Sequence, residues 1–169
     1  MNLIERHASK TLKKFAGEFP AVLITGARQT GKTTILKSYT DERGIDSLTF
    51  DDPQEELSAK TDPKAFMEFH KSPYMFDEIQ YVPELFRYIK MSIDMDRHNG
   101  MFFLTGSQQV PLAEKASESL AGRVGIVQLY PLSQREIRNE TFDAPFIPNK
   151  EYINYMFQRF KIFEYSVEK

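Results

Sequence analysis

The sequence contains no cysteine, so it can form neither disulfide bonds nor thiolate metal sites, and a reducing cytoplasm is favoured. It also lacks a charge excess. The net charge is −2 over 169 residues, which gives no electrostatic argument for nucleic acid or an anionic membrane as a partner. The three histidines, His7, His70 and His98, show no metal-ligand spacing. No apolar run approaches the roughly 20 residues that a bilayer-spanning helix requires. We therefore expect a cytoplasmic protein with no membrane partner.

Two kinds of hydrophobic pattern alternate along the chain. Short apolar segments alternate with stretches of helical spacing, and the first helical stretch, within residues 1–15, is followed by Gly17 as a stop signal. Strands that alternate with helices predict a parallel sheet covered on both faces. The apolar segments expected to form strands are residues 21–25, 48–50, 74–76, 101–105 and 126–129.

Three local signals predict helix starts. Asp52-Pro53 and Asp62-Pro63 each place a capping aspartate before a proline at the first helical position. Ser133 with Glu136 three residues later forms a capping-box pattern. Residues 139–149 have loop composition, and the aromatic and charged segment after them is compatible with one more helix.

One segment fits the pattern G-x-x-x-x-G-K-[ST], and it lies between an apolar strand and a helical stretch, as a phosphate-binding loop requires. Its glycines let backbone N–H groups turn toward phosphate oxygens, and the following helix adds its positive end. Lys32 is expected to reach the β- and γ-phosphates and the Thr33 hydroxyl to bind Mg²⁺. The alternative is a chance glycine-rich turn. The predicted nucleotide-binding residues are Gly26, Ala27, Arg28, Gln29, Thr30, Gly31, Lys32, Thr33 and Thr34.

Two acids end the apolar strand of residues 74–76. Functional residues of parallel sheets gather at the carboxyl ends of the strands, so Asp77 is expected beside the phosphate loop as a Mg²⁺ ligand. Glu78 is expected to accept the proton of the attacking water, a role that contributes roughly 10²–10⁴-fold in rate. A solvated acidic turn that caps the next helix is the alternative for this pair.

Two further signals are weaker. The strand of residues 101–105 ends in small polar residues, so Thr105 or Ser107 would face the γ-phosphate, with a simple turn as the alternative. Arg123 lies just before the last strand, where a guanidinium could stabilise the transferring phosphoryl group in its own site or in a neighbour's. The alternative for Arg123 is a solvated arginine at a strand edge.

The motifs of guanine-specific GTPases are not present. The sequence 149–152 has Tyr152 where the pattern N-K-x-D requires aspartate, and Asp77 is not followed by a glycine at the fourth position. ATP with Mg²⁺ is therefore the expected ligand. Nothing in the sequence resembles the acceptor site or arginine-rich lid of a small-molecule kinase.

Taken together, the chain resembles a prokaryotic family of predicted AAA-type P-loop ATPases. The resemblance covers residues 20–136, and six motifs occur in order. These motifs are residues 26–34 (GARQTGKTT), 50–53 (FDDP), 77–85 (DEIQ followed by VPEL), 104–107 (LTGS), 120–123 (LAGR) and 129–136 (LYPLS with Glu136). The resemblance implies a three-layer α/β sandwich with a five-stranded parallel sheet of order 5-1-4-3-2 and helices on both faces. It also implies working positions for Lys32, Thr33, Asp77, Glu78, Ser107 and Arg123.

Members of that family usually continue into a C-terminal domain of unknown function, so the chain is interpreted as an ATPase domain (residues 1–138) followed by a loop and the start of a lid or linker helix (residues 139–169). The predicted function is Mg²⁺-dependent ATP hydrolysis, slow in isolation, by a module coupled to an unknown protein or DNA effector through that further region. Arg123 implies a homo-oligomer. The alternative is a nucleotide-dependent binding switch with little or no turnover.

Overall fold

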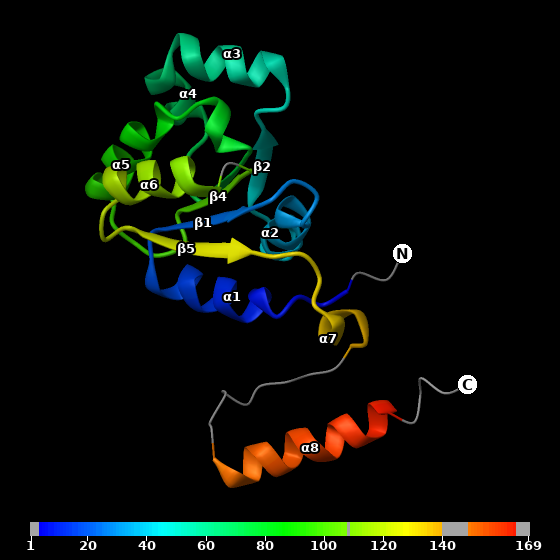
Figure 1. The fold of residues 1–169 in the computed structure, drawn as a ribbon. Coiled ribbons are helices and arrows are strands. Elements are labelled where there is room, and N and C mark those ends of the chain that lie inside the picture. The colour runs from blue at the N-terminus through cyan, green and yellow to red at the C-terminus, as the bar shows by residue number, and fades with distance from the viewer. Residues whose placement is uncertain (1–3, 108, 140–148, 165–169) are drawn as a thin grey trace. The chain divides into compact units, whose positions relative to one another are not determined.

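The computed structural model describes residues 4–107, 109–139 and 149–164. Its centre is a sheet of five parallel strands in the order β2-β3-β4-β1-β5 (Figure 1). Read from the other edge, this is the order 5-1-4-3-2, so the predicted fold class and strand order are confirmed. The strands are β1 (Ala21–Gly26), β2 (Asp46–Thr49), β3 (Tyr74–Asp77), β4 (Phe102–Gly106) and β5 (Val124–Leu129).

Alternation along the strands divides the core into two layers. In β1, Val22 and Ile24 pack against the helices of one face, whereas Ala21 and Leu23 pack against those of the other. This division follows from the period of two in a strand, and a strand buried on both faces reads as a continuous apolar run. The first face is covered by α1 (Ala8–Glu18) and α2 (Lys32–Asp41). The second is covered by α3 (Pro53–Thr61), α4 (Pro63–Phe69), the short 3₁₀ helix η1 (Ile79–Tyr81), α5 (Leu85–Met95) and α6 (Gln109–Ser119).

The predicted helix starts are confirmed at the level of individual hydrogen bonds. The Asp52 carboxylate accepts from the Gln54 backbone N–H at 2.8 Å, and the Asp62 carboxylate accepts from Ala65 at 3.0 Å. Both capping-box bonds of Ser133 and Glu136 are present at the start of α7 (Gln134–Ile137). Short local patterns of this kind are readable because each involves residues only two or three apart.

The end of the first helix differs from the prediction. Gly17 lies inside α1, which continues to Glu18. The helix ends at Phe19, whose φ of −122° and ψ of 143° are extended. Phe19 precedes Pro20, and proline disfavours the helical conformation of the residue before it. Proline, and not the glycine, therefore ends this helix.

The chain divides into two compact units, Met1–Asn139 and Glu140–Lys169. The sheet and the helices α1 to α7 belong to the first unit. In the second, α8 (Lys150–Glu164) is the described element, and Asn149 Oδ1 accepts from Tyr152 N–H at 2.8 Å near its start. Most of the loop predicted over residues 139–149 lies outside the described residues.

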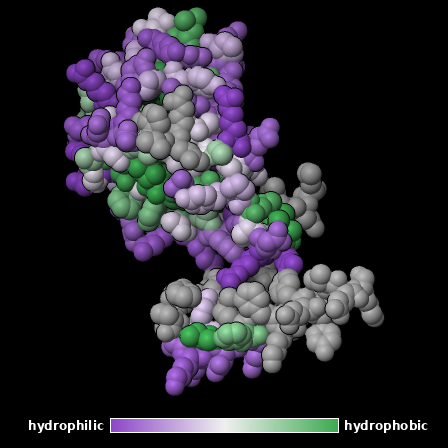
Figure 2. All heavy atoms as spheres, viewed as in Figure 1, coloured by the Kyte–Doolittle hydropathy of each residue, from purple (hydrophilic) through white to green (hydrophobic). Residues whose placement is uncertain are grey.

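On the face shown in Figure 2, hydrophilic residues predominate on the first unit and hydrophobic residues gather in a few separate patches. Of the helices in the described parts of the chain, none is long and apolar enough to cross a bilayer.

Candidate active site

The phosphate loop follows β1 and leads into α2. At two positions of the loop the backbone geometry requires glycine. A Cβ on Gly26 would lie 2.3 Å from the Leu129 carbonyl oxygen of the neighbouring β5, a separation that backbone atoms cannot accept. Gly31 has φ of 89°, in the left-handed region that side chains other than glycine rarely adopt. The loop therefore curls tightly at the carboxyl end of β1 and opens into α2.

Lys32 is the first residue of α2 and is almost fully buried, with 4% of its surface exposed. Its ammonium donates to the Ala27 carbonyl oxygen at 3.0 Å, and the Thr30 hydroxyl donates to the same oxygen at 2.9 Å. An ammonium has three N–H donors, and this carbonyl is the one acceptor that the described residues provide. Two donors therefore remain for an anionic ligand in the loop.

Two strands and the helix α2 bring hydroxyl and carboxylate groups to the same edge of the sheet. The Thr33 hydroxyl donates to the Asp77 carboxylate at 2.8 Å, and the Thr105 hydroxyl donates to the same carboxylate oxygen. Thr105 also accepts from the Glu78 backbone N–H at 3.0 Å. The buried Asp77 is thus oriented by hydroxyl groups from two elements and has no basic partner among the described residues.

Glu78 is held in an unusual backbone conformation. Its φ of 55° and ψ of 46° are left-handed, which turns the side chain away from the strand direction. The Ser107 hydroxyl lies 2.8 and 3.0 Å from the two carboxylate oxygens, and the Gln80 amide donates to one of them. The Gln80 oxygen accepts from the Ser107 backbone N–H at 3.2 Å. Together with Thr33, Asp77 and Thr105, these three residues form what we call the acidic cluster.

The phosphate loop and three residues of the acidic cluster line one cavity of about 430 Å³. Lys32, Thr33, Thr34, Glu78 and Ser107 all contribute to its walls. The remaining lining residues are Arg28, Gln29, Gly31, Asp51 and Tyr81. Two cationic side chains, Lys32 and Arg28, therefore line the cavity. The Arg28 side chain is exposed and makes no hydrogen bond or ion pair with another described residue.

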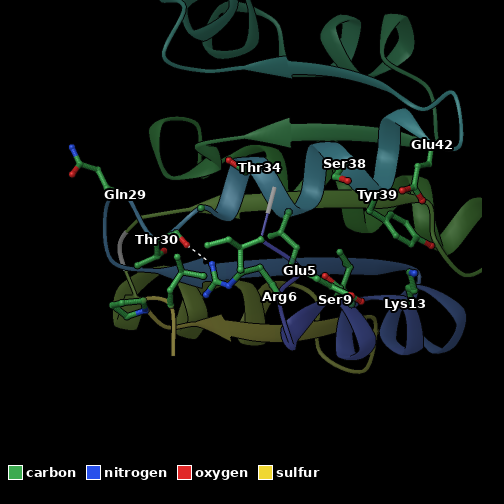
Figure 3. Close-up of a pocket in the computed structure, with 16 residues that line it drawn as sticks. Glu5, Arg6, Ser9, Lys13, Gln29, Thr30, Thr34, Ser38, Tyr39 and Glu42 are labelled. Atoms are coloured by element: carbon green, nitrogen blue, oxygen red, sulfur yellow. Dashed lines mark hydrogen bonds between the residues drawn. The ribbon is translucent and has the colours of Figure 1, made fainter. Parts of the chain in front are cut away.

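A second cavity, of about 620 Å³, lies on the other side of the loop between α1 and α2 (Figure 3). It shares Gln29, Gly31 and Thr34 with the first cavity. Figure 3 shows side chains from the N-terminal segment and α1, such as Ser9, facing residues of α2, such as Ser38. The volume lies in the range of small-molecule sites, and its apolar lining comes from Ile4, Leu12, Ile35 and Leu132 together with Tyr39 and Pro131.

The wall of this second cavity includes an arginine that joins three distant segments. Arg6 donates to the Thr30 carbonyl oxygen at 2.7 Å, to the Tyr130 carbonyl oxygen at 2.6 Å and to the Glu136 carboxylate at 3.0 Å. The Arg6 and Glu136 side chains are 11% and 6% exposed. We call these four groups the arginine clasp.

Glu136 is ionised over the ordinary pH range despite its burial. Burial alone would raise the pKa of its carboxyl group, but the Ser133 and His7 backbone N–H groups, the Arg6 guanidinium and the Ser133 hydroxyl all donate to it and lower its pKa to about 2. Hydrogen bonds to the charged form favour that form. Arg6 and Glu136 in the clasp are therefore a nearly buried ion pair whose carboxylate accepts several hydrogen bonds.

Arg123 is placed away from both cavities. It precedes β5, and its carbonyl oxygen accepts from the backbone N–H of Ala21, the first residue of β1. The phosphate loop follows the opposite ends of these parallel strands, and six residues of strand span roughly 20 Å. The guanidinium instead pairs with Asp94 at 2.7 Å. The structure does not bring Arg123 to the phosphate loop of its own chain.

The predicted residues Lys32, Thr33, Asp77, Glu78 and Ser107 do lie together at one edge of the sheet. Sequence analysis assigned no role to Arg6 or Gln80. Gln80 belongs to the motif that follows Asp77, which could have directed attention to it. Arg6 is one of several charged residues before the first helix and carries no comparable signal.

The chain is similar in sequence to two curated proteins. Two curated proteins, one from Mycobacterium bovis and one from Mycobacterium tuberculosis, are each 34% identical to the chain over 151 residues, and both are named only as uncharacterized proteins. The match covers 83% of this chain and 32% of each relative, so the chain spans about a third of the length of the curated relatives it matches.

The fold is similar to that of a solved DNA replication initiation factor, with a TM-score of 0.50 over 88% of this chain and 52% of that protein. The sequence identity is 16%, so this likeness concerns the fold. The sequence model of a family described as AAA domain matches residues 18–138, which include both cavities' loop residues, the acidic cluster and Glu136. The chain therefore belongs to the AAA domain family, as an AAA-type P-loop ATPase domain.

Proposed function

We propose that this domain binds ATP with Mg²⁺ in the phosphate loop and hydrolyses it slowly, with Glu78 as the proton acceptor. The observation that carries the proposal is that the loop, Glu78 and Ser107 line one cavity, with Asp77 bonded to Thr33 in its wall. Lys32 supplies charge to the β- and γ-phosphates, and Ser107 lies where its hydroxyl can bind either Glu78 or a γ-phosphate oxygen.

The residues present fit a magnesium ion. The Thr33 hydroxyl and the Asp77 carboxylate are 2.8 Å apart, and hard oxygen donors of this kind are the ligands that Mg²⁺ takes. Such an ion is usually held by one or two protein oxygens together with water and substrate phosphates. When bound, it would neutralise charge on the β- and γ-phosphates. Thr105 keeps the Asp77 carboxylate turned toward Thr33.

We propose that the adenine base and the ribose of the nucleotide bind in the second cavity. It adjoins the phosphate loop through Gln29, Gly31 and Thr34, and its lining combines apolar side chains with hydroxyl groups. Filling it through Ser38→Phe, an exposed position on α2, should weaken ATP, ADP and AMP by a common factor. If the loss of affinity instead grew with the number of phosphates, the adenine base would bind outside this cavity.

One observation favours the alternative of a binding switch with little turnover. The Glu78 carboxylate is held by the Ser107 hydroxyl and the Gln80 amide, so both of its oxygens are engaged within the protein. Hydrolysis requires at least one oxygen to become available to water. A domain that binds ATP tightly and releases no phosphate above background would favour the switch.

The proposal extends to an effector and to a neighbouring subunit. Because Arg123 lies on the opposite edge from its own nucleotide site, its proposed action on a phosphoryl group is in an adjacent copy. The similar solved protein is a DNA replication initiation factor, which makes DNA one effector to test. The net charge of −2 provides no electrostatic argument for DNA binding by the chain itself.

Calorimetry and phosphate release on the same chain test these proposals together. ATP, ADP, AMP and GTP are titrated with and without Mg²⁺, and turnover is measured with and without duplex DNA. We expect ATP and ADP to bind in the presence of Mg²⁺, with slow release of phosphate from ATP. A chain that binds none of the four nucleotides is not the nucleotide-binding module proposed here.

A further inference from the structure

Arg6 contacts the phosphate loop from a segment that lies before the first helix. Its Nη1 donates to the carbonyl oxygen of Thr30 at 2.7 Å. Figure 3 shows the Arg6 guanidinium extended toward Thr30, with this bond drawn between them. The side chain is 11% exposed, so water competes little for the contact. A charged donor thus holds one carbonyl group of the loop from outside the loop.

The Thr30 carbonyl and the Gly31 N–H belong to the same peptide group. A trans peptide is planar, and its C=O and N–H bonds point in opposite directions. Arg6 lies on the outer side of this peptide: a Cβ on Gly31 would lie 3.4 Å from Arg6 Nη1. Because Arg6 holds the carbonyl, the Gly31 N–H points away from Arg6, and Gly31 also lines the cavity that contains Lys32. Inward N–H groups of this kind are what a phosphate loop offers to its ligand.

The position of Arg6 is itself fixed by Glu136. That carboxylate accepts from Arg6 Nε at 3.0 Å, from the His7 N–H at 2.9 Å and from the Ser133 N–H at 2.7 Å. The Tyr130 carbonyl accepts from Arg6 Nη2 at 2.6 Å. An arginine fork with several acceptors has little freedom to turn. The segment after β5 therefore sets where the guanidinium meets the loop.

We propose that Arg6 is a positioning residue for the phosphate loop: it holds the peptide between Thr30 and Gly31 in the orientation that binds the β-phosphate, and Glu136 holds Arg6. This inference rests on the proposed nucleotide-binding function. Loss of Arg6 should therefore weaken the binding of nucleotides that have a β-phosphate and spare AMP, because only the former use the Gly31 N–H group. A contact with the adenine base, or a purely structural role, would not distinguish ADP from AMP.

The experiment compares ADP and AMP binding by calorimetry in the full chain and in Arg6→Gln. We expect ADP to bind about three- to tenfold more weakly to the variant, the range of one hydrogen bond's net contribution, with ATP weakened by the same factor. AMP affinity should stay within about twofold. Arg6→Lys, which keeps the charge but lacks the fork, should recover part of the ADP affinity.

Lys14→Gln is the matched control. Lys14 is on α1, the helix that follows Arg6, and its side chain is 68% exposed and pairs with Glu18. The variant removes one positive charge and leaves the arginine clasp unchanged. If it lost as much ADP affinity as Arg6→Gln, a general effect of charge would explain both losses and the inference would be wrong. If Arg6→Gln fails to fold, Glu136→Gln keeps Arg6 and should show the same dependence on the β-phosphate, with a smaller loss.

The outcomes separate the inference from the function on which it rests. If the wild-type chain binds no ADP, the proposed nucleotide site fails. If the wild type binds ADP and folded Arg6→Gln binds it equally well, only the role of Arg6 fails. Equal losses for ADP and AMP would overturn the inference in another way, by making Arg6 a ligand of the base or ribose.

Discussion

The acidic cluster and the arginine clasp both contact the phosphate loop, but they come from different parts of the chain. The cluster joins side chains that follow β1, β3 and β4, which are neighbours in the sheet. The clasp joins Arg6 to Glu136, 130 residues apart. One set of contacts follows directly from the sheet, whereas the other closes the beginning of the domain onto its end.

Their environments differ as well. Glu78 and Ser107 line an open cavity, where their hydrogen bonds can be exchanged for bonds to a ligand. Arg6 and Glu136 are nearly buried, and each makes at least three hydrogen bonds within the protein. Groups that can exchange partners are suited to chemistry, and groups with fixed partners are suited to holding shape. We therefore expect substitutions in the cluster to change rates and those in the clasp to change affinity and stability.

The largest effect is expected in the acidic cluster. Glu78→Gln keeps the shape of the side chain but is a far poorer proton acceptor, so ATP hydrolysis should fall by roughly 10²–10⁴-fold. ATP affinity by calorimetry should remain within about threefold, since the ligand contacts proposed for the loop are unchanged. Glu84→Gln, at an exposed position outside the cavity, is the control. Hydrolysis by Glu78→Gln at the wild-type rate would remove Glu78 from the role of base.

The corresponding change in the clasp is Glu136→Gln, which leaves Arg6 buried without its charged partner. We expect a loss of about 3 kcal/mol in the free energy of unfolding at pH 7. The pKa of Glu136 is lowered to about 2 in the folded chain and is near 4.3 in unfolded chains. Its contribution is therefore present above about pH 4.3 and is lost as the pH falls toward 2.

Urea unfolding of the two proteins from pH 7 to pH 3.5 measures this difference. The difference in the free energy of unfolding between wild type and Glu136→Gln should become smaller as the pH decreases. Glu118→Gln, an exposed acid on α6, should differ little from the wild type throughout. A gap that stays constant over this range would mean that the Glu136 carboxylate is not the source of the stability.

Lys32→Ala tests the loop that lies between the two sets of contacts. A hydrogen bond from a charged donor contributes about 1.5–3 kcal/mol, so ATP affinity should fall by roughly 10- to 150-fold. Lys37→Ala, at an exposed position on the same helix, should leave ATP affinity unchanged. Calorimetry that finds equal ATP affinity for wild type and Lys32→Ala would mean that this loop does not hold phosphate.

The smallest signal is expected from mixing Arg123→Ala with Glu78→Gln. Each variant alone should hydrolyse ATP very slowly if Arg123 acts on a neighbour's nucleotide. In an equal mixture, about a quarter of the sites would combine an intact Glu78 with a neighbour's Arg123, if copies assemble head to tail at random. Partial return of phosphate release is the expected result. Absence of recovery in a sample shown to contain mixed oligomers would restrict Arg123 to its ion pair with Asp94.

The difference between the two sets of contacts also decides what could be predicted from sequence. Lys32, Asp77 and Ser107 follow apolar strands, and parallel strands bring their carboxyl ends to one edge, so their meeting could be expected. Ser133 and Glu136 could be paired because a capping box is local. No local rule relates Arg6 to Glu136, because their contact depends on how α1 and the segment after β5 pack against the sheet.

Two other results show where local patterns were insufficient. Gly17 predicts a helix stop, but α1 continues through it to Glu18 and ends where Pro20 disfavours a helical conformation of Phe19. Arg123 was placed correctly before the last strand, yet the sequence left open whether it reaches its own nucleotide. The parallel direction of β5 places it at the opposite edge, where Asp94 of α5 is its partner.

The position of β1 between β4 and β5 has a consequence for synthesis on the ribosome. Its two neighbours, β4 and β5, begin at Phe102 and Val124, and Glu136 comes still later. At roughly 5–20 residues per second, the residues of the phosphate loop are translated several seconds before the strands that flank it and the carboxylate that holds Arg6. A nascent chain would then carry the complete phosphate-binding motif while it still lacks the surroundings that shape the loop. The capacity to hold a nucleotide would be acquired only when the last part of the domain leaves the ribosome.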